Sequence, residues 1–124
     1  MVKNLWGDLS SLEKVRTPKT ILEEQASLLT DATGGMLVGE VKDESLFGGF
    51  KYSLEVIVPA LNRYSYTILT VDYPVDVYPV TLKASRPVVW DQCGNEEELV
   101  TGIEKILSSR EIRSALATLK SQVS

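Results

Sequence analysis

The sequence predicts an α+β fold in two layers: an N-terminal helix, a four- to five-stranded antiparallel meander sheet and two C-terminal helices. Apolar residues recur at helical spacing before residue 34 and after residue 95, whereas between residues 50 and 84 they recur at every second position. The segments between the predicted strands are too short for a helical crossover, so consecutive strands are expected to be antiparallel. A length of 124 residues suits one domain, 1–124, with a single hydrophobic core.

The first helix is predicted to follow Thr17-Pro18, because proline is tolerated in a first helical turn. Segment 21–32 carries an apolar stripe close to i, i+4, i+7 spacing, and Gly34-Gly35 ends it, since glycine accepts the left-handed conformation that closes a helix. Residues 1–16 are predicted to be irregular or briefly helical. Their larger apolar side chains are expected to pack onto the core, namely those of Leu5, Trp6, Leu9 and Leu12.

Strands are predicted over 36–43, 50–58, 63–73 and 77–85, with a short fifth over 88–95 that runs into a loop. Alternation places Tyr64, Tyr66 and Ile68 on one face of the third strand, and Leu69 and Val71 on the other. Pro79 cannot donate a hydrogen bond to a neighbouring strand. Its strand is therefore expected at an edge of the sheet, or with a bulge at that point.

Two helices are predicted after residue 95. Asn95 caps the first, whose acidic start at 96–98 complements the positive end of the helix dipole. Ser108 and Glu111 form a capping box that opens the second. The expected buried stripes are Leu99, Ile103, Ile106 and Leu107 in the first helix, and Ile112, Leu116, Leu119 and Val123 in the second.

Composition and charge narrow the classes of partner. The net charge of -4 argues against nucleic acid or anionic lipid as the main partner, because binding to phosphates needs a positive field. No apolar run approaches the roughly 20 residues of a membrane-spanning helix, and the start of the chain lacks a secretory core. The single cysteine excludes an internal disulfide and suits a reducing compartment, so a cytoplasmic location is expected.

The chain contains no histidine, which removes the usual general base and the usual zinc ligand. Acid–base chemistry would therefore fall to carboxylates, lysine or tyrosine with displaced pKa values. Cys93 lies near a predicted helix start, where the dipole could lower a thiol pKa, but without a base a structural thiol is favoured over a nucleophile. No catalytic residue, metal ligand or cofactor is predicted, and the absence of histidine makes an enzyme less expected without excluding it.

Two segments resemble a family of small uncharacterised bacterial proteins. These are TPKTILEEQASLL at 17–29 and VPALNRYSYTILTVDYPVDVYPV at 58–80. The resemblance implies a bacterial, cytosolic, single-domain protein from a mobile-element or gene-cassette setting. It implies no activity, so no residue inherits a role from it.

Aromatic residues form the candidate site. Rings that alternate along the second and third strands could lie side by side on one sheet face, and others flank the turn that follows. If the helices leave that face uncovered, it would offer an apolar contact surface with hydroxyl groups. The alternatives are that the N-terminal segment covers these rings or that they belong to the core. The residues are Phe50, Tyr52, Tyr64, Tyr66, Tyr73 and Tyr78.

The preferred hypothesis is a non-catalytic interaction or binding module that self-associates as a homodimer through the face or edge of its sheet, and that binds a protein or small ligand there. The alternative is a small enzyme or ligand-binding domain that uses tyrosine and carboxylate groups in a pocket between sheet and helices. A nucleic-acid binder would have suitable aromatic residues but the wrong charge.

Overall fold

A computed structural model describes residues 2–123. The elements follow the predicted order, with two short 3₁₀ turns in addition, η1 (Leu9–Ser11) and η2 (Pro59–Leu61). The helices are α1 (Pro18–Ala32), α2 (Glu96–Leu107) and α3 (Arg110–Val123). The strands are β1 (Val38–Asp43), β2 (Phe50–Val58), β3 (Tyr64–Tyr73), β4 (Val80–Ser85) and β5 (Val88–Cys93).

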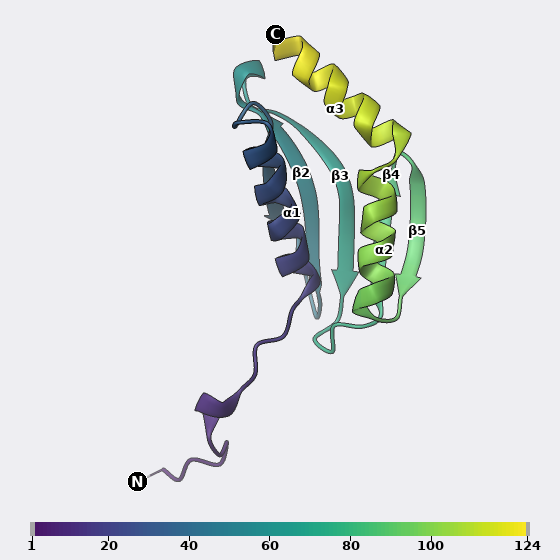
Figure 1. The fold of residues 1–124 in the computed structure, drawn as a ribbon. Coiled ribbons are helices and arrows are strands. Elements are labelled where there is room, and N and C mark those ends of the chain that lie inside the picture. The colour runs from purple at the N-terminus through teal and green to yellow at the C-terminus, as the bar shows by residue number, and fades with distance from the viewer. Residues whose placement is uncertain (1, 124) are drawn as a thin grey trace.

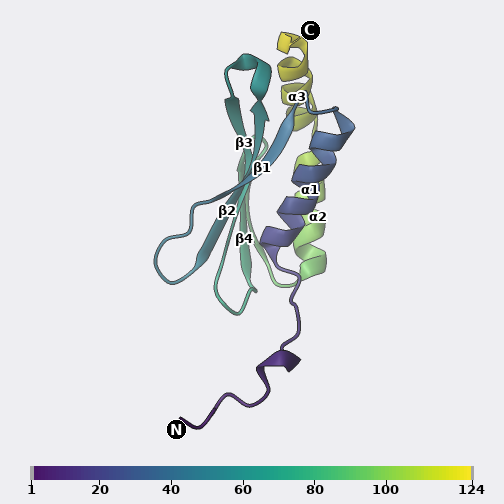
Figure 2. The same ribbon diagram turned by 90° about the vertical axis from the view of Figure 1, so that its left-hand side faces the viewer.

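The five strands form one sheet in the order β1-β2-β3-β4-β5, and every neighbouring pair is antiparallel. The three helices lie on one face of this sheet (Figure 2). The predicted α+β meander is therefore confirmed. The expectation for Pro79 is wrong, because β4 starts one residue later, at Val80, and is paired on both sides.

Side-chain caps set the helix starts. The Thr17 hydroxyl accepts a hydrogen bond from the Thr20 amide at 3.3 Å, and the Asn95 side chain accepts one from the Glu98 amide at 2.9 Å. The last helix starts later than predicted. Ser109 caps it, because its hydroxyl accepts a hydrogen bond from the Ile112 amide at 3.2 Å. The Ser108 hydroxyl instead donates to the carbonyl oxygen of Glu104 in α2.

The core lies between the sheet and the helix layer, and a β-bulge decides which side chains enter it. Leu54 pairs with Leu69, but the next residue of β2 pairs with Thr67, so Ile68 is an extra residue in β3. The extra residue shifts the alternation by one, so that Tyr64 and Tyr66 face the helices together with Leu69. The prediction that they lie on the opposite face from Leu69 is wrong for this reason.

The helices cover opposite halves of the sheet. Helix α1 lies over β1 and β2, and α2 lies over β4 and β5, with β3 between them (Figure 1). Three strand spacings separate their centres by roughly 14 Å, more than the about 8–10 Å of directly packed helices. A groove therefore remains between the two helices.

Residues 2–16 form an N-terminal arm that extends away from the domain (Figures 1 and 2). Leu5, Trp6 and Leu12 are 84%, 81% and 75% exposed, and Leu9 is half-exposed. The prediction that these side chains pack onto the core is wrong. The Arg16 guanidinium pairs with Glu24 on α1 at 2.5 Å and with Glu96 on α2 at 2.9 Å, which holds the base of the arm at one end of the helix layer.

Candidate functional site

The first group of predicted aromatic residues lies at the end of the sheet where α1 begins. Tyr52 and Tyr73 are 7% and 5% exposed, and their ring centroids are 6.2 Å apart. Phe50 packs on Tyr73 at 5.5 Å and is partly exposed, while the Lys19 ammonium lies 5.4 Å from the Tyr52 ring. Two of these three rings are core residues and are closed to a partner.

The second group lies at the other end of the sheet. Tyr64 and Tyr66 line a pocket of about 260 Å³ between β3 and α3. Arg86 and Glu111 also line this pocket, which therefore combines tyrosine, a carboxylate and a guanidinium. Tyr64 is the half-exposed member of this lining.

Tyr78 lies in the connection between β3 and β4. Its hydroxyl is buried and has no hydrogen-bond partner among the described residues. Burial raises the pKa of Tyr78, and the nearby Glu96 and Cys93 add to the effect. Together with Tyr52, Tyr73 and Tyr66 it packs into or against the core, so the expectation of aromatic rows on an uncovered sheet face is wrong.

The middle of the uncovered face carries mainly hydroxyl and charged side chains. The Ser53 and Thr70 hydroxyls are hydrogen-bonded across β2 and β3 at 3.1 Å, and Thr67 donates to the Glu55 carboxylate at 3.2 Å. The register adds lysines of both flanking strands to this face, Lys42 from β1 and Lys83 from β4. Mixed charges and short hydroxyl side chains do not make an apolar interface.

The two edges of the sheet differ in how well they are protected against pairing with another strand. On β1, the Gly39 amide donates to the Thr30 hydroxyl of α1 at 2.9 Å, and the strand carries three charged residues. On β5, which pairs only with β4, no lysine, arginine or proline occurs. Lysine and proline are common protections of an edge strand, so the β5 edge, meaning the outer side of Val88–Cys93, is the more open of the two.

Two large apolar side chains stand on the β5 edge. Val88 is 87% exposed and Trp90 is 70% exposed. The Lys83 ammonium lies 4.3 Å from the Trp90 ring centroid, which fixes the indole over the neighbouring strand. This edge is not among the predicted sites, although a tryptophan beside valines in the last strand of a meander is a sequence signal for it.

Cys93 ends β5 and is buried. Burial raises the pKa of its thiol, and the carboxylates of Asp91 and Glu98 raise it further. The start of α2 therefore does not activate the thiol, which stays protonated near neutral pH. This supports a structural cysteine over a nucleophile.

Stability should be nearly constant between about pH 6 and 8, because the chain has no histidine, and should fall above the unfolded thiol pKa of about 8.5. Folding raises the pKa of Cys93, and burial likewise raises the pKa of Tyr73 and of Tyr78. Such a group stabilises the folded state fully below its unfolded pKa, and this contribution is lost as pH rises through the folded value. Urea unfolding from pH 6 to 11 measures the effect.

The variant Cys93→Ala should remove the part of the loss of stability that begins at the lowest pH. The loss at higher pH, which is due to Tyr73 and Tyr78, should remain. A free energy of unfolding that already falls steeply between pH 6 and 8 would contradict the expectation, since another buried acid would then have to titrate.

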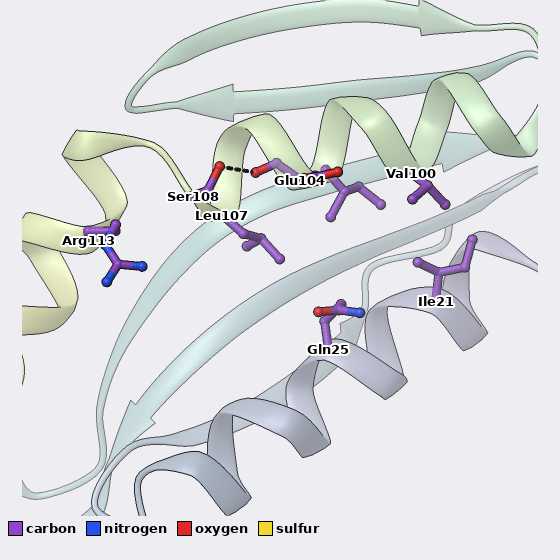
Figure 3. Close-up of a pocket in the computed structure, with 8 residues that line it drawn as sticks. Ile21, Gln25, Val100, Glu104, Leu107, Ser108 and Arg113 are labelled. Atoms are coloured by element: carbon purple, nitrogen blue, oxygen red, sulfur yellow. Dashed lines mark hydrogen bonds between the residues drawn. The ribbon is translucent and has the colours of Figure 1, made fainter.

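A groove of about 350 Å³ runs between α1 and α2 (Figure 3). Ile21 and Gln25 of α1 face Val100 and Leu107 of α2 across it. Ile103 adds to the apolar lining, and polar groups stand at the rim and at one end. The polar residues are Gln25, Glu104, Ser108 and Arg113.

A further polar pocket of about 530 Å³ lies beside the start of α2, with Asp91, Glu97, Glu98 and Lys105 in its lining. No set of three or more cysteine, aspartate or glutamate residues among residues 2–123 could hold a metal ion. Ser53 is the one buried polar residue of the described chain, so each described carboxylate keeps some contact with solvent. In the same range, no helix has the length and apolar character needed to span a bilayer.

No protein-family model matches the chain, and no curated protein or solved structure is significantly similar to it. The family resemblance of segments 17–29 and 58–80 stays a prediction, and only the chain's own surfaces inform its function.

Proposed function

We propose that the chain is a non-catalytic interaction module that self-associates as a homodimer through its β5 edge. The observation that carries this proposal is the outer strand without lysine, arginine or proline, on which Val88 and Trp90 are exposed. A strand with free amide and carbonyl groups is a template for another strand, and main-chain hydrogen bonds then supply the affinity. A second copy of β5 is the simplest such strand.

Charge favours one register of this pairing. Two β5 strands related by a two-fold axis lie antiparallel. At the axis, one residue lies opposite the same residue of the other chain. If Asp91 stood there, two carboxylates would be opposed, which destabilises cross-strand pairs. If Trp90 stands there, each Asp91 lies opposite Val89 of the second copy, and the two indoles meet on the uncovered face. We take the register centred on Trp90.

Trp90→Lys tests the proposal. Lysine at this position adds repelling charges at the axis and removes the indole, so the dimer should dissociate at least tenfold more readily. Sedimentation velocity from about 1 to 100 μM measures the change, with far-UV circular dichroism as a check on folding. Leu28→Lys is the matched control, because Leu28 is exposed on α1, which contacts β1 and β2 at the opposite side of the sheet from β5. A Trp90→Lys chain as dimeric as the wild type contradicts the β5 dimer.

A second candidate function rests on the pocket beneath α3. Its combination of Tyr64, Tyr66, Arg86 and Glu111 suits a small ligand that carries both an acidic group and a hydrogen-bond donor. The exposure of every described carboxylate to solvent favours the interaction module, since an acid or base poised for catalysis near neutral pH usually needs burial.

The setting that fits this module is the cytoplasm. A single buried thiol with a raised pKa resists oxidation and suits a reducing compartment, and the net charge of -4 disfavours nucleic acid and anionic membranes as partners. A protein or small ligand remains the class of partner that the surface chemistry supports.

A further inference from the structure

The N-terminal arm holds the largest run of unpacked apolar side chains in the described chain. Val2, Leu5, Trp6, Leu9 and Leu12 are all exposed, and none packs against the core cluster. Water-exposed tryptophan and leucine side chains at this density are typical of a segment that binds another surface.

The spacing of these side chains is helical. At 100° per residue, positions 2, 5, 6, 9 and 12 fall within an arc of about 120°, with Lys3, Ser10, Ser11 and Lys14 outside it. One turn is already coiled as η1, capped by Asp8, whose carboxylate accepts from the Ser10 amide at 3.0 Å. Gly7 has a φ of 76° and interrupts the helix in the free arm. The arm can become an amphipathic helix if Gly7 and the extended residues on either side of η1, among them Asp8 and Leu12, change conformation.

The α1–α2 groove has the shape that such a helix needs. Val100, Ile103 and Leu107 line it at i, i+3 and i+7 along α2. Leu5 and Leu12 are also seven residues apart, so both stripes are roughly 10 Å long at 1.5 Å per residue. An amphipathic helix laid into a groove by i, i+4 and i+7 anchors is a recurring mode of protein recognition.

The direction of the arm indicates that it docks into the groove of a second copy and not into the groove of its own chain. The arm joins the N-terminal end of α1 and runs away from the groove (Figure 1). The two ion pairs of Arg16 fix the point where the arm meets the domain. Docking into its own groove would require the chain to reverse direction between Glu13 and Arg16, next to the two ion pairs that fix Arg16. A second molecule can receive the arm without this reversal. Reciprocal exchange of two arms would also be isologous, as symmetric dimers require.

We propose that residues 2–12 of one molecule fold as a helix in the α1–α2 groove of a second copy. This contact goes beyond the β5 pairing and shares no residue with it. The two can therefore fail separately.

The experiment uses the Trp90→Lys chain, which removes the β5 contact and leaves Trp6 as the sole tryptophan. As the concentration rises from about 1 to 100 μM, the Trp6 emission should shift to the blue while the mass rises from monomer to dimer. Adding Val100→Glu should abolish both changes, because the new carboxylate lies in the apolar lining. Val100 is partly exposed, so the domain should still fold, and far-UV circular dichroism checks this.

Leu28→Glu is the matched control, since Leu28 is exposed on α1 but does not line the groove, and it should leave both signals in place. Gly7→Ala tests the helical form. Alanine disfavours the positive φ of the free arm and favours a helix, so the association should tighten about fivefold.

Four results would overturn the inference. Trp6 emission that is blue-shifted in a monomer at all concentrations would place the arm in its own groove. Emission typical of water up to 100 μM would show that the arm does not dock. Weaker association of Gly7→Ala would rule out the helical form, and a dimer unaffected by Val100→Glu would place the arm elsewhere.

Discussion

Gly39→Ala should lower the free energy of unfolding by about 3 kcal/mol, the upper part of the usual range for a substitution that overfills a packed site. A Cβ atom at Gly39 would lie 2.4 Å from the carbonyl oxygen and 2.5 Å from the Cα of Ala26. Both are backbone atoms of α1, so no side-chain rotation can relieve the clash, and the helix must move away from β1. The movement would also stretch the hydrogen bond from the Gly39 amide to Thr30.

Gly102→Ala is the matched control for this effect. Its Cβ would meet the Cδ2 of Leu82 at 2.7 Å, which is the end of a side chain that can adjust. Alanine also favours a helix over glycine by about 1 kcal/mol, which offsets part of the strain. Urea denaturation of both variants should therefore show a much larger fall in midpoint for Gly39→Ala. Equal midpoints would mean that α1 is free to shift on β1.

Leu22→Ala should destabilise the domain by about 3–4 kcal/mol, because it removes a side chain that is 0% exposed and leaves a cavity between α1 and the sheet. At about 4 °C per kcal/mol for a domain of this size, the melting temperature should fall by roughly 12–16 °C. Thermal unfolding followed by circular dichroism measures the change.

Leu28→Ala makes the same chemical change on the same helix, at a position that is 59% exposed. Its effect should stay within about 0.5 kcal/mol. If the two variants melted at the same temperature, Leu22 would not be part of a packed core and the placement of α1 on the sheet would be wrong.

The elements themselves were largely predictable, because their signals are local. A cap such as Thr17 or Asn95 acts on an amide three residues away, and the apolar stripes of α1 and α2 repeat within two turns. The start of α3 was misjudged by one residue, since Ser108 and Ser109 are adjacent and either could cap. Only the hydrogen bond from the Ile112 amide to Ser109 distinguishes them.

The candidate site was less predictable, and the reason is the single residue Ile68. Whether Tyr64 and Tyr66 point toward the helices or away from them depends on the register between β2 and β3, and the bulge changes that register in mid-strand. The alternation of residues 63–73 does not indicate that Ile68 is an extra residue, because isoleucine suits either face of a strand.

The order of helices and strands, the antiparallel meander and the absence of histidine chemistry were thus determined along the chain, by contacts between near neighbours and by composition. The covered face, the open β5 edge and the α1–α2 groove were decided by the placement of residues far apart in sequence, such as Ile21 and Val100 on the two sides of the groove. Near-neighbour interactions fix local conformation, whereas exposure depends on which distant segments the folded chain brings against each side chain.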